Sequence, residues 1–548
     1  MQILAILTNG GDTCALNASI KSIRDNAYHV GYKKIYGIRR GYQGLVDGSI
    51  DDITHREIDV RIGGSCLGSL RVSPTDWNQK KEEYEINEER CHKMAQCLSD
   101  YKIDVLMVIG GDGTLQATKM FQDWVHHKVV TQEFRPFEIM GFLKTIDNDI
   151  RTFTHFEGIE VSLCPGFPSA VTKIVSCIED LRVTARTAER AFSVETMGRD
   201  AGWLAASTTF GGAEILLVPE HLRYYLRRFF PNKNKIDKEV SDRVMSDLVD
   251  QTVSFYQKNR NVLIGVAEGF EPVIDIEAMK KFAETIRDLY GPRKKVGATE
   301  LVTMLVSPVL EHYFWCLSHL CDQMRRSVDL PRAVKAVMNE ANKNDVGRKY
   351  SEKVKNAKEH PLKCWNAESK LLETVGLRSR ENENVGSKQH ASLTQIIAHN
   401  SHVSQQTDES SSGKGYKRMS SPMSIPPYKF EIRPHRTDYL PRSGPPSAYD
   451  YKLATVLGEK TGQMLLSKEF SSVPALDKVV PYKDLNVNVV KPVHIKEIET
   501  LNFISNDYFD PEVCLHVSGR ITNFFRTIMT GPDDLEKAIH EYNKENNK

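Results

Sequence analysis

Short, uninterrupted apolar runs alternate with longer amphipathic stretches through roughly the first 330 residues of this 548-residue chain. The clearest runs are residues 3–8, 105–109, 139–143, 215–218 and 262–266. Runs of this length, rich in Val, Ile and Leu, are typical of strands buried on both faces, and the helical patterns between them are typical of crossovers. The sequence therefore predicts parallel α/β sheets, whose ligands bind where the carboxyl ends of strands meet loops.

Charge and cysteine content exclude several other classes of protein. The chain has 73 Lys and Arg against 72 Asp and Glu, a net charge of +1, which predicts no nucleic-acid or membrane partner. No apolar run reaches the roughly 18 residues of a transmembrane span, and no signal-peptide pattern opens the sequence. Its ten cysteines contain no CxxC pair, which is typical of reduced thiols. We expect a cytoplasmic, multidomain protein.

The segment from about 345 to 428 differs in character from the rest. Charged, helix-like sequence gives way to a stretch rich in Ser and Gln at 404–413. Too few apolar residues are available there to offset the entropy of ordering, so we expect part of it to be mobile. Strand- and helix-like patterning resumes near residue 429, and a last helix is expected from Pro532 to Asn543, with Pro532 suited to its first turn.

Glycine-rich loops follow two of the predicted strands, at 8–12 and 110–114, and each contains an Asp. Glycines let backbone N–H groups approach a phosphate, and the helix after each loop directs its positive end toward it. A third loop, 63–71, combines Gly63, Gly64 and Gly68 with the permanent charge of Arg71. A tight turn between strand and helix would also use glycine, but two such loops favour phosphate binding.

Two aspartates, Asp147 and Asp149, follow the buried strand that ends at Leu143. One carboxylate can accept a proton while the other helps to hold a metal ion, and phosphoryl transfer needs both roles. An Asx-rich turn exposed to solvent is the alternative explanation.

Further along the chain, Arg199 follows Met197 and Gly198, and Glu268 closes another strand. The arginine could stabilise a transferring phosphoryl group, and the glutamate would lie at the same edge of a sheet. A surface ion pair and a capping role are the respective alternatives.

In order and approximate spacing, these motifs resemble those of the phosphofructokinase family. The resemblance covers most of residues 1–310 and resumes at about 429–500, and its most specific parts are 145–149 and 197–203. The stretch 110–114 is also similar to nicotinamide-nucleotide and lipid kinases, whereas the paired aspartates separate phosphofructokinases from them. The resemblance implies two doubly wound, mostly parallel α/β sheets with the active site in the cleft between them, plus a long insertion.

The resemblance also implies a role for each matched residue. Asp147 is expected to take the proton from the sugar 1-hydroxyl, and Asp112, with Asp149, to organise Mg²⁺. Thr145 and Arg199 match positions beside the transferring phosphate, and Lys144 is expected to be catalytic with them. The implied donor-binding residues are Gly11, Arg71, Gly111, Asp112, Gly113 and Thr114. The implied sugar-phosphate-binding residues are Thr145, Asp147, Asp149, Arg190, Met197, Gly198, Arg199, Glu268, Arg433, Tyr439 and Arg442.

By the same resemblance, Arg190 matches an arginine that often reaches a neighbouring subunit, so we expect a homo-oligomer, either a dimer or a tetramer. The implied domains are a donor-binding unit at 1–160, to which the chain returns at about 443–500, and a sugar-phosphate-binding unit at 161–320. The second unit is expected to include returns at about 429–442 and 501–548, and residues 321–428 are expected to form a partly helical, partly disordered insertion.

The expected reaction moves the γ-phosphoryl of ATP to the 1-hydroxyl of fructose 6-phosphate. Pyrophosphate-using members usually have an Asp where this chain has Gly113, so Gly113 favours ATP, whereas Lys144 is typical of pyrophosphate enzymes. A pyrophosphate-dependent enzyme and a non-catalytic regulatory subunit are the alternatives. Cys14 and Ala15 replace the family's usual Pro and Gly, and we expect the Cβ of Ala15 to crowd the donor phosphates.

Overall fold

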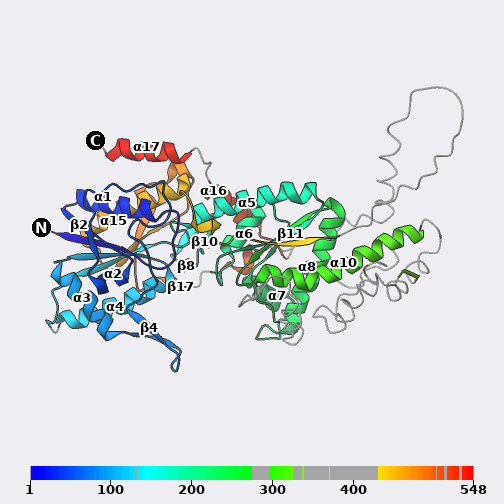
Figure 1. Cartoon of the computed structure of the whole chain (residues 1–548), viewed down its shortest axis with the longest axis horizontal. Coiled ribbons are helices and arrows are strands. Elements are labelled where there is room, and N and C mark those ends of the chain that lie inside the picture. Colours follow the sequence, from blue (N-terminus) through cyan, green and yellow to red (C-terminus); the bar gives the residue numbers. More distant parts are fainter. Residues whose placement is uncertain are drawn as a thin grey trace, which may run out of the picture.

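The computed structural model describes residues 2–130, 132–273, 297–324, 336–337, 370, 430–500, 503–510, 515–529 and 534–546. Most of the predicted insertion at 321–428, with the serine-rich stretch, lies outside these residues. Two sheets lie one after the other along the longest axis of the molecule, the first at the N-terminal end of the chain (Figure 1).

The first sheet has the strand order β3-β2-β1-β6-β7, and only its edge strand β3 runs antiparallel to its neighbour. Its strands are β1 (Ile3–Thr8), β2 (Lys34–Ile38), β3 (Ile50–Asp52), β6 (Val105–Gly110) and β7 (Glu138–Leu143). Alternate side chains of β1 enter different cores: Leu4 and Ile6 pack into one, Ala5 and Leu7 into the other. This explains the continuous apolar runs, because both faces of each central strand are covered.

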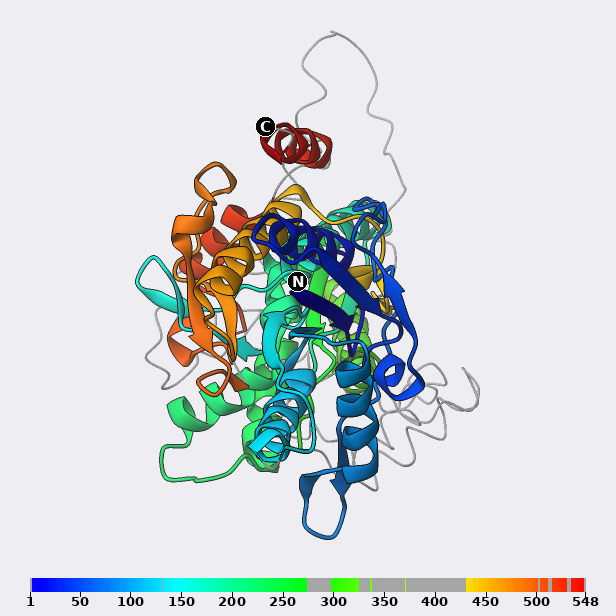
Figure 2. The ribbon, with the colours of Figure 1, turned by 90° about the vertical axis from the view of Figure 1, so that its left-hand side faces the viewer.

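Helices cover both faces of this sheet. The core that contains Leu4 and Ile6 also receives α1 (Leu16–His29) and α15 (Ala448–Ser467). The other core receives α2 (Tyr42–Asp47), α3 (Glu88–Asp100) and α4 (Asp112–Val130). The last described helix, α17 (Asp534–Asn546), packs on α15, and Figure 2 shows it above α1 and α15.

The second sheet has the order β12-β13-β11-β14 and is parallel throughout. Its strands are β11 (Ala191–Thr196), β12 (Ile215–Leu217), β13 (Val262–Ala267) and β14 (Ile432–Arg436), so the chain returns to complete it after residue 429. The helices around it are α5 (Phe167–Thr187), α6 (Trp203–Phe210), α7 (Pro219–Phe229), α8 (Lys238–Asn259), α10 (Ala298–Met324) and α16 (Gly519–Ile528).

Short strands complete the described structure. They pair as β4 (Thr75–Asn78) with β5 (Glu83–Ile86), β8 (Ile150–Arg151) with β17 (Glu499–Thr500), β9 (Thr154–Phe156) with β10 (Ile159–Val161), and β15 (Ser472–Leu476) with β16 (Val490–His494). All of these pairs are antiparallel.

The predicted fold class, two mostly parallel α/β sheets, is confirmed. Predicted and observed strands agree within a residue, and 3–8 is reproduced as β1. The predicted final helix corresponds to α17, although Pro532 lies outside the described residues. None of the described helices is long and apolar enough to span a membrane. The domain limits stay a prediction.

Candidate active site

A cleft with a volume of about 360 Å³ opens at the carboxyl ends of β1, β6 and β7. Loops from the first sheet form most of it, and Arg199 and Arg442 enter from segments that follow β11 and β14 of the second sheet. The predicted residues that line it are Gly11, Arg71, Gly111, Asp112, Gly113, Thr114, Lys144, Thr145, Asp147, Asp149, Arg199 and Arg442.

Two glycine-rich loops form one wall of the cleft. Gly10 has a φ of +87°, a conformation that favours glycine, and the neighbouring Asn9 amide lies 3.4 Å from the Thr114 hydroxyl of the second loop. A Cβ placed on Gly11 would lie 2.7 Å from Nη1 of Arg442, whereas a Cβ on Gly113 would meet nothing within 4 Å. Gly113 therefore faces open space.

Lys144 is buried beneath these loops, with 3% of its surface exposed. Its Nζ donates a hydrogen bond to the carbonyl of Gly11. Burial, followed by the positive charge of Arg442, lowers the pKa of Lys144 to about 8. A lysine held in this way supplies a positive charge to an anion in the cleft.

Asp147 has an environment suited to proton transfer. Only 4% of the residue is exposed, and its Oδ2 lies 3.6 Å from Nε of Arg199. Its Oδ1 is buried and has no hydrogen-bond partner among the described residues. Burial, and then the negative charge of Asp149, raise the pKa of Asp147 to about 6. Such a carboxylate can accept a proton near neutral pH.

The loop that carries Asp147 is held by its own side chains. The Thr145 hydroxyl accepts a hydrogen bond from the backbone N–H of Asp147 at 3.0 Å and donates to Oδ1 of Asp149 at 3.1 Å. Asn148, between the two aspartates, has a φ of +56°. This turn directs both carboxylates into one cleft.

Asp112 stands in the first turn of α4 and accepts a hydrogen bond from Nε2 of Gln116 at 2.9 Å. Burial, and to a lesser degree the charge of Asp149, raise its pKa. No group of three or more potential metal ligands occurs within the described part of the chain. Mg²⁺ commonly binds through one or two carboxylates together with substrate phosphates, so Asp112 and Asp149 fit the donor set that this ion needs.

Arg199 is held in place by Glu268. Gly198 and Arg199 both have positive φ, at +139° and +50°. The carboxylate of Glu268, after β13, accepts hydrogen bonds from their backbone N–H groups at 3.1 and 2.8 Å. The structure thus gives Glu268 a positioning contact with the turn that presents Arg199.

Six predicted residues do not line the cleft: Arg190, Met197, Gly198, Glu268, Arg433 and Tyr439. Arg190 precedes β11, at its amino end, where it and Arg433 each form an ion pair with Glu431. Tyr439 is 71% exposed. Arg442 is among the predicted sugar-phosphate-binding residues, and its Nη1 donates to the carbonyl of Asp12 at 2.9 Å, which places it against the first glycine loop.

Ala15 does not crowd the cleft in the way that its sequence position predicts. Its side chain is fully buried in an apolar cluster with Val60, Ala448 and Tyr451. Cys14 beside it is also buried, and its Sγ lies 2.9 Å from Nζ of Lys173.

Eleven residues that line the cleft are not among the predicted site residues, and they include Asn9, Trp77, Tyr84 and Gln116. Gln116 lies four residues after Asp112, the spacing at which helical side chains meet. Trp77 and Tyr84 lie opposite each other on β4 and β5. Alternation of these aromatic residues with charged and polar neighbours is a strand signal that could have indicated the hairpin.

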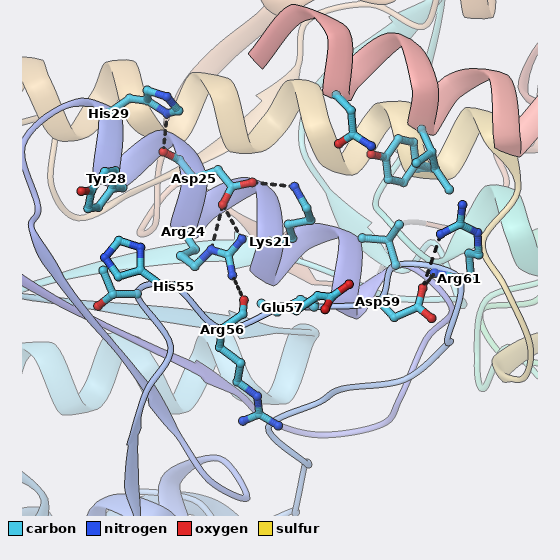
Figure 3. Close-up of a pocket in the computed structure, with 16 residues that line it drawn as sticks. Lys21, Arg24, Asp25, Tyr28, His29, His55, Arg56, Glu57, Asp59 and Arg61 are labelled. Atoms are coloured by element: carbon cyan, nitrogen blue, oxygen red, sulfur yellow. Dashed lines mark hydrogen bonds and ion pairs between the residues drawn. The ribbon is translucent and has the colours of Figure 1, made fainter. Parts of the chain in front are cut away.

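A larger cavity, of about 550 Å³, lies between α1, the segment 54–61, α15 and α17. Many of its charged groups neutralise one another: Asp25 forms ion pairs with Lys21 and Arg24, and Arg61 with Asp59 (Figure 3). It contains none of the glycine-rich loops, so its size does not make it the better candidate for the reaction.

Comparison with known proteins agrees with this geometry. The model of the family described as "Phosphofructokinase" matches residues 3–304. An ATP-dependent 6-phosphofructokinase of Oceanobacillus iheyensis is 34% identical over 224 residues, which are 40% of this chain and 60% of that protein. Its counterpart in Clostridioides difficile is 35% identical over 229 residues, with the same two coverages. The chain thus spans about 60% of the length of these relatives.

Solved structures show the same fold. A pyrophosphate-dependent phosphofructokinase from Nitrosospira multiformis superposes with a TM-score of 0.56 at 14% identity, covering 97% of this chain and 92% of that one. One from Marinobacter aquaeolei gives 0.54 at 13% identity, with the same coverages. With the family model matched over more than half of its length, this chain belongs to the phosphofructokinase family.

Proposed function

We propose that this protein is a Mg²⁺-dependent 6-phosphofructokinase, which transfers the γ-phosphoryl of ATP to the 1-hydroxyl of fructose 6-phosphate. The observation that supports it most is Oδ1 of Asp147, a buried carboxylate oxygen without a hydrogen-bond partner in the described structure, in a cleft lined by two glycine-rich loops. An unpaired buried oxygen is costly unless a ligand satisfies it.

In the proposed reaction, Asp147 accepts the proton of the sugar 1-hydroxyl as its oxygen attacks the γ-phosphorus. The bond between the γ-phosphorus and the bridging oxygen breaks, and ADP leaves with the electron pair. Arg199 and Lys144 provide positive charge beside the transferring group, and the backbone N–H groups of the glycine loops bind the donor phosphates.

Asp112 and Asp149 would hold the metal ion. When bound, Mg²⁺ neutralises part of the charge on the donor phosphates. The charge of Asp149 contributes to the raised pKa values of both Asp112 and Asp147, and a cation beside these carboxylates would lower them again.

The relatives' names and the space at Gly113 both support ATP as the donor. Lys144 is the observation that favours pyrophosphate instead. Because a Cβ at Gly113 would meet nothing within 4 Å, substitutions there can enter the cleft without disturbing the fold. This allows the donor to be tested at one position.

The deciding experiment measures fructose 6-phosphate phosphorylation by the purified protein with ATP and with pyrophosphate. We expect turnover with ATP and little with pyrophosphate. Gly113→Asp should weaken ATP use strongly, and Gly113→Asn, which fills the same space without the charge, should weaken it less. Turnover with pyrophosphate alone would establish the alternative enzyme. Binding of the sugar phosphate without turnover on either donor would instead support a regulatory subunit.

A further inference from the structure

The hairpin formed by β4 and β5 carries an exposed aromatic pair. Trp77 and Tyr84 face each other across the two strands, with ring centroids 5.0 Å apart and an interplanar angle of 69°. Such a pair stabilises a hairpin, which accounts for the contact between the rings. It does not account for their exposure, because 53% of Trp77 and 52% of Tyr84 remain accessible.

Both rings line the same cleft as the two glycine-rich loops. One face of α4 runs along the cleft between the glycine-rich loops and the hairpin. Its residues Gly113, Gln116, Ala117 and Met120 all line the cleft and recur at helical spacing. At 1.5 Å per residue, Gly113 and Met120 are about 10 Å apart along the helix axis. Three of these four residues are small or apolar, so this face of α4 can contact a ligand that continues beyond the phosphates.

The two ends of the cleft differ in chemistry. Lys144, Arg199 and Arg442 give one end its positive charge, and the aromatic pair gives the other end exposed ring faces. A ligand that uses both ends needs a polyphosphate joined through a spacer to a flat aromatic ring. A nucleoside triphosphate has this form, whereas pyrophosphate has no ring and would leave Trp77 and Tyr84 unused.

We propose that Trp77 and Tyr84 bind the base of the phosphoryl donor by stacking, and so select nucleoside triphosphates over inorganic polyphosphates. The inference rests on the proposed function in assigning the donor to this cleft. Stacking between a base and an aromatic side chain is typically lost on substitution by alanine, with about 10- to 100-fold weaker binding.

Equilibrium binding, measured by titration calorimetry on the full chain, tests this with two probes. ATP has a base, and inorganic tripolyphosphate has the same three phosphates without one. For Trp77→Ala and Tyr84→Ala we expect the Kd for ATP to rise by about 10-fold or more, while the Kd for tripolyphosphate stays unchanged. Trp77→Phe keeps an aromatic ring and should restore most of the ATP affinity.

The matched control is Tyr101→Ala. Tyr101 forms a similar edge-to-face pair with Tyr36, at 5.5 Å, but neither residue lines the cleft. This variant should bind both probes as the wild type does. Equal weakening of ATP and tripolyphosphate in the hairpin variants, or no weakening of either, would overturn the inference.

Turnover is measured separately, so that the two proposals can fail independently. If the wild type phosphorylates fructose 6-phosphate with ATP but the hairpin variants bind ATP normally, the proposed function stands and the role of the pair is refuted. If ATP binding depends on Trp77 and Tyr84 but fructose 6-phosphate is not phosphorylated, the role of the pair is supported and the kinase proposal fails.

Discussion

Asp147 combines burial with an unpaired oxygen, and both properties have measurable consequences. A second buried carboxylate provides the comparison: Asp450 accepts hydrogen bonds from the backbone N–H groups of Gly166, at 2.9 Å, and Ser169, at 3.3 Å. Burial raises the pKa of each of the two aspartates to about 6. Both oxygens of Asp450 accept hydrogen bonds from the protein, which is the pattern of a structural residue, whereas Oδ1 of Asp147 has no partner among the described residues.

The first prediction concerns pH. Asp147 must be deprotonated to accept a proton, and kcat/KM reports the pKa values of the free enzyme, so kcat/KM for ATP should fall below about pH 6, by roughly tenfold per pH unit. Because sugar phosphates and ATP also titrate near this pH, fructose 6-phosphate binding is measured over the same range. A kcat/KM for ATP that stays constant down to pH 5 would contradict the assignment.

The second prediction concerns stability. Burial raises the pKa of Asp147 from 3.8 to about 6, so the folded protein holds this proton more tightly than the unfolded chain. The free energy of unfolding therefore falls as pH rises between these two values, and the loss is complete at pH 7. Asp147→Asn removes this charge and should stabilise the protein by about 1–3 kcal/mol at pH 7, measured as a higher Tm.

At pH values well below 4 the stabilisation should disappear, because the wild-type carboxyl is then neutral in both states. Asp450→Asn is the matched control and should lower the Tm at pH 7. In the wild type the backbone N–H groups of Gly166 and Ser169 donate to carboxylate oxygens, and in the variant they would face the NH2 group of the new side chain. A destabilised Asp147→Asn variant would show that protein contacts satisfy this carboxylate.

The residues that could be predicted from sequence are those whose chemistry follows a strand directly. Asp112, Lys144 and Asp147 stand within a few residues of a buried apolar run, and parallel strands bring their carboxyl ends to one edge. Trp77 and Tyr84 gave no comparable signal, because they lie on a short exposed hairpin and reach the cleft only through packing against α4.

At the scale of elements, the turn after β11 depends on its neighbour in the sheet. β13 pairs with β11 along its whole length, and this register brings Glu268 beside the N–H groups of Gly198 and Arg199. The sequence placed Glu268 at the edge of the sheet but could not show which group it contacts, because the pairing joins strands far apart in the chain.

The third prediction distinguishes a positioning role for Glu268 from a direct contact with the sugar. If it positions Arg199, Glu268→Ala should lower kcat by about tenfold or more with a small change in the KM for fructose 6-phosphate. Glu268→Gln keeps an oxygen that can accept both hydrogen bonds and should restore much of the rate. A higher KM for the sugar phosphate in both variants, with unchanged kcat, would indicate a direct sugar contact.

At the scale of the whole molecule, residues that follow strands of both sheets line the cleft, and the amino end of the second sheet lies away from it. Arg190 stands before β11, six residues from its last residue, Thr196, so the strand separates it from the cleft by about 20 Å. Here Arg190 and Arg433 each form an ion pair with Glu431, at 3.0 and 2.8 Å. That Arg190 serves another subunit stays a prediction.

The fourth prediction tests that arrangement by mixing variants. Arg190→Ala and Asp147→Ser are each expected to be inactive or weak. If Arg190 acts on the neighbouring chain of a symmetric dimer, a mixed dimer contains one complete site, so an equal mixture should regain about a quarter of the sites. Activity no higher than that of the single variants, in a mixture shown by light scattering to exchange chains, would assign Arg190 to another role.

The central claim is that distant loops bring a base and cations around one reacting centre. Its most direct measurement is the steady-state turnover of Asp147→Ser in a coupled assay with ATP, together with its affinity for fructose 6-phosphate. We predict that turnover falls by about 100-fold or more while the affinity is nearly unchanged, because the interaction lost is made in the transition state. Turnover close to that of the wild type would contradict the claim, because Asp147 would then not be the base.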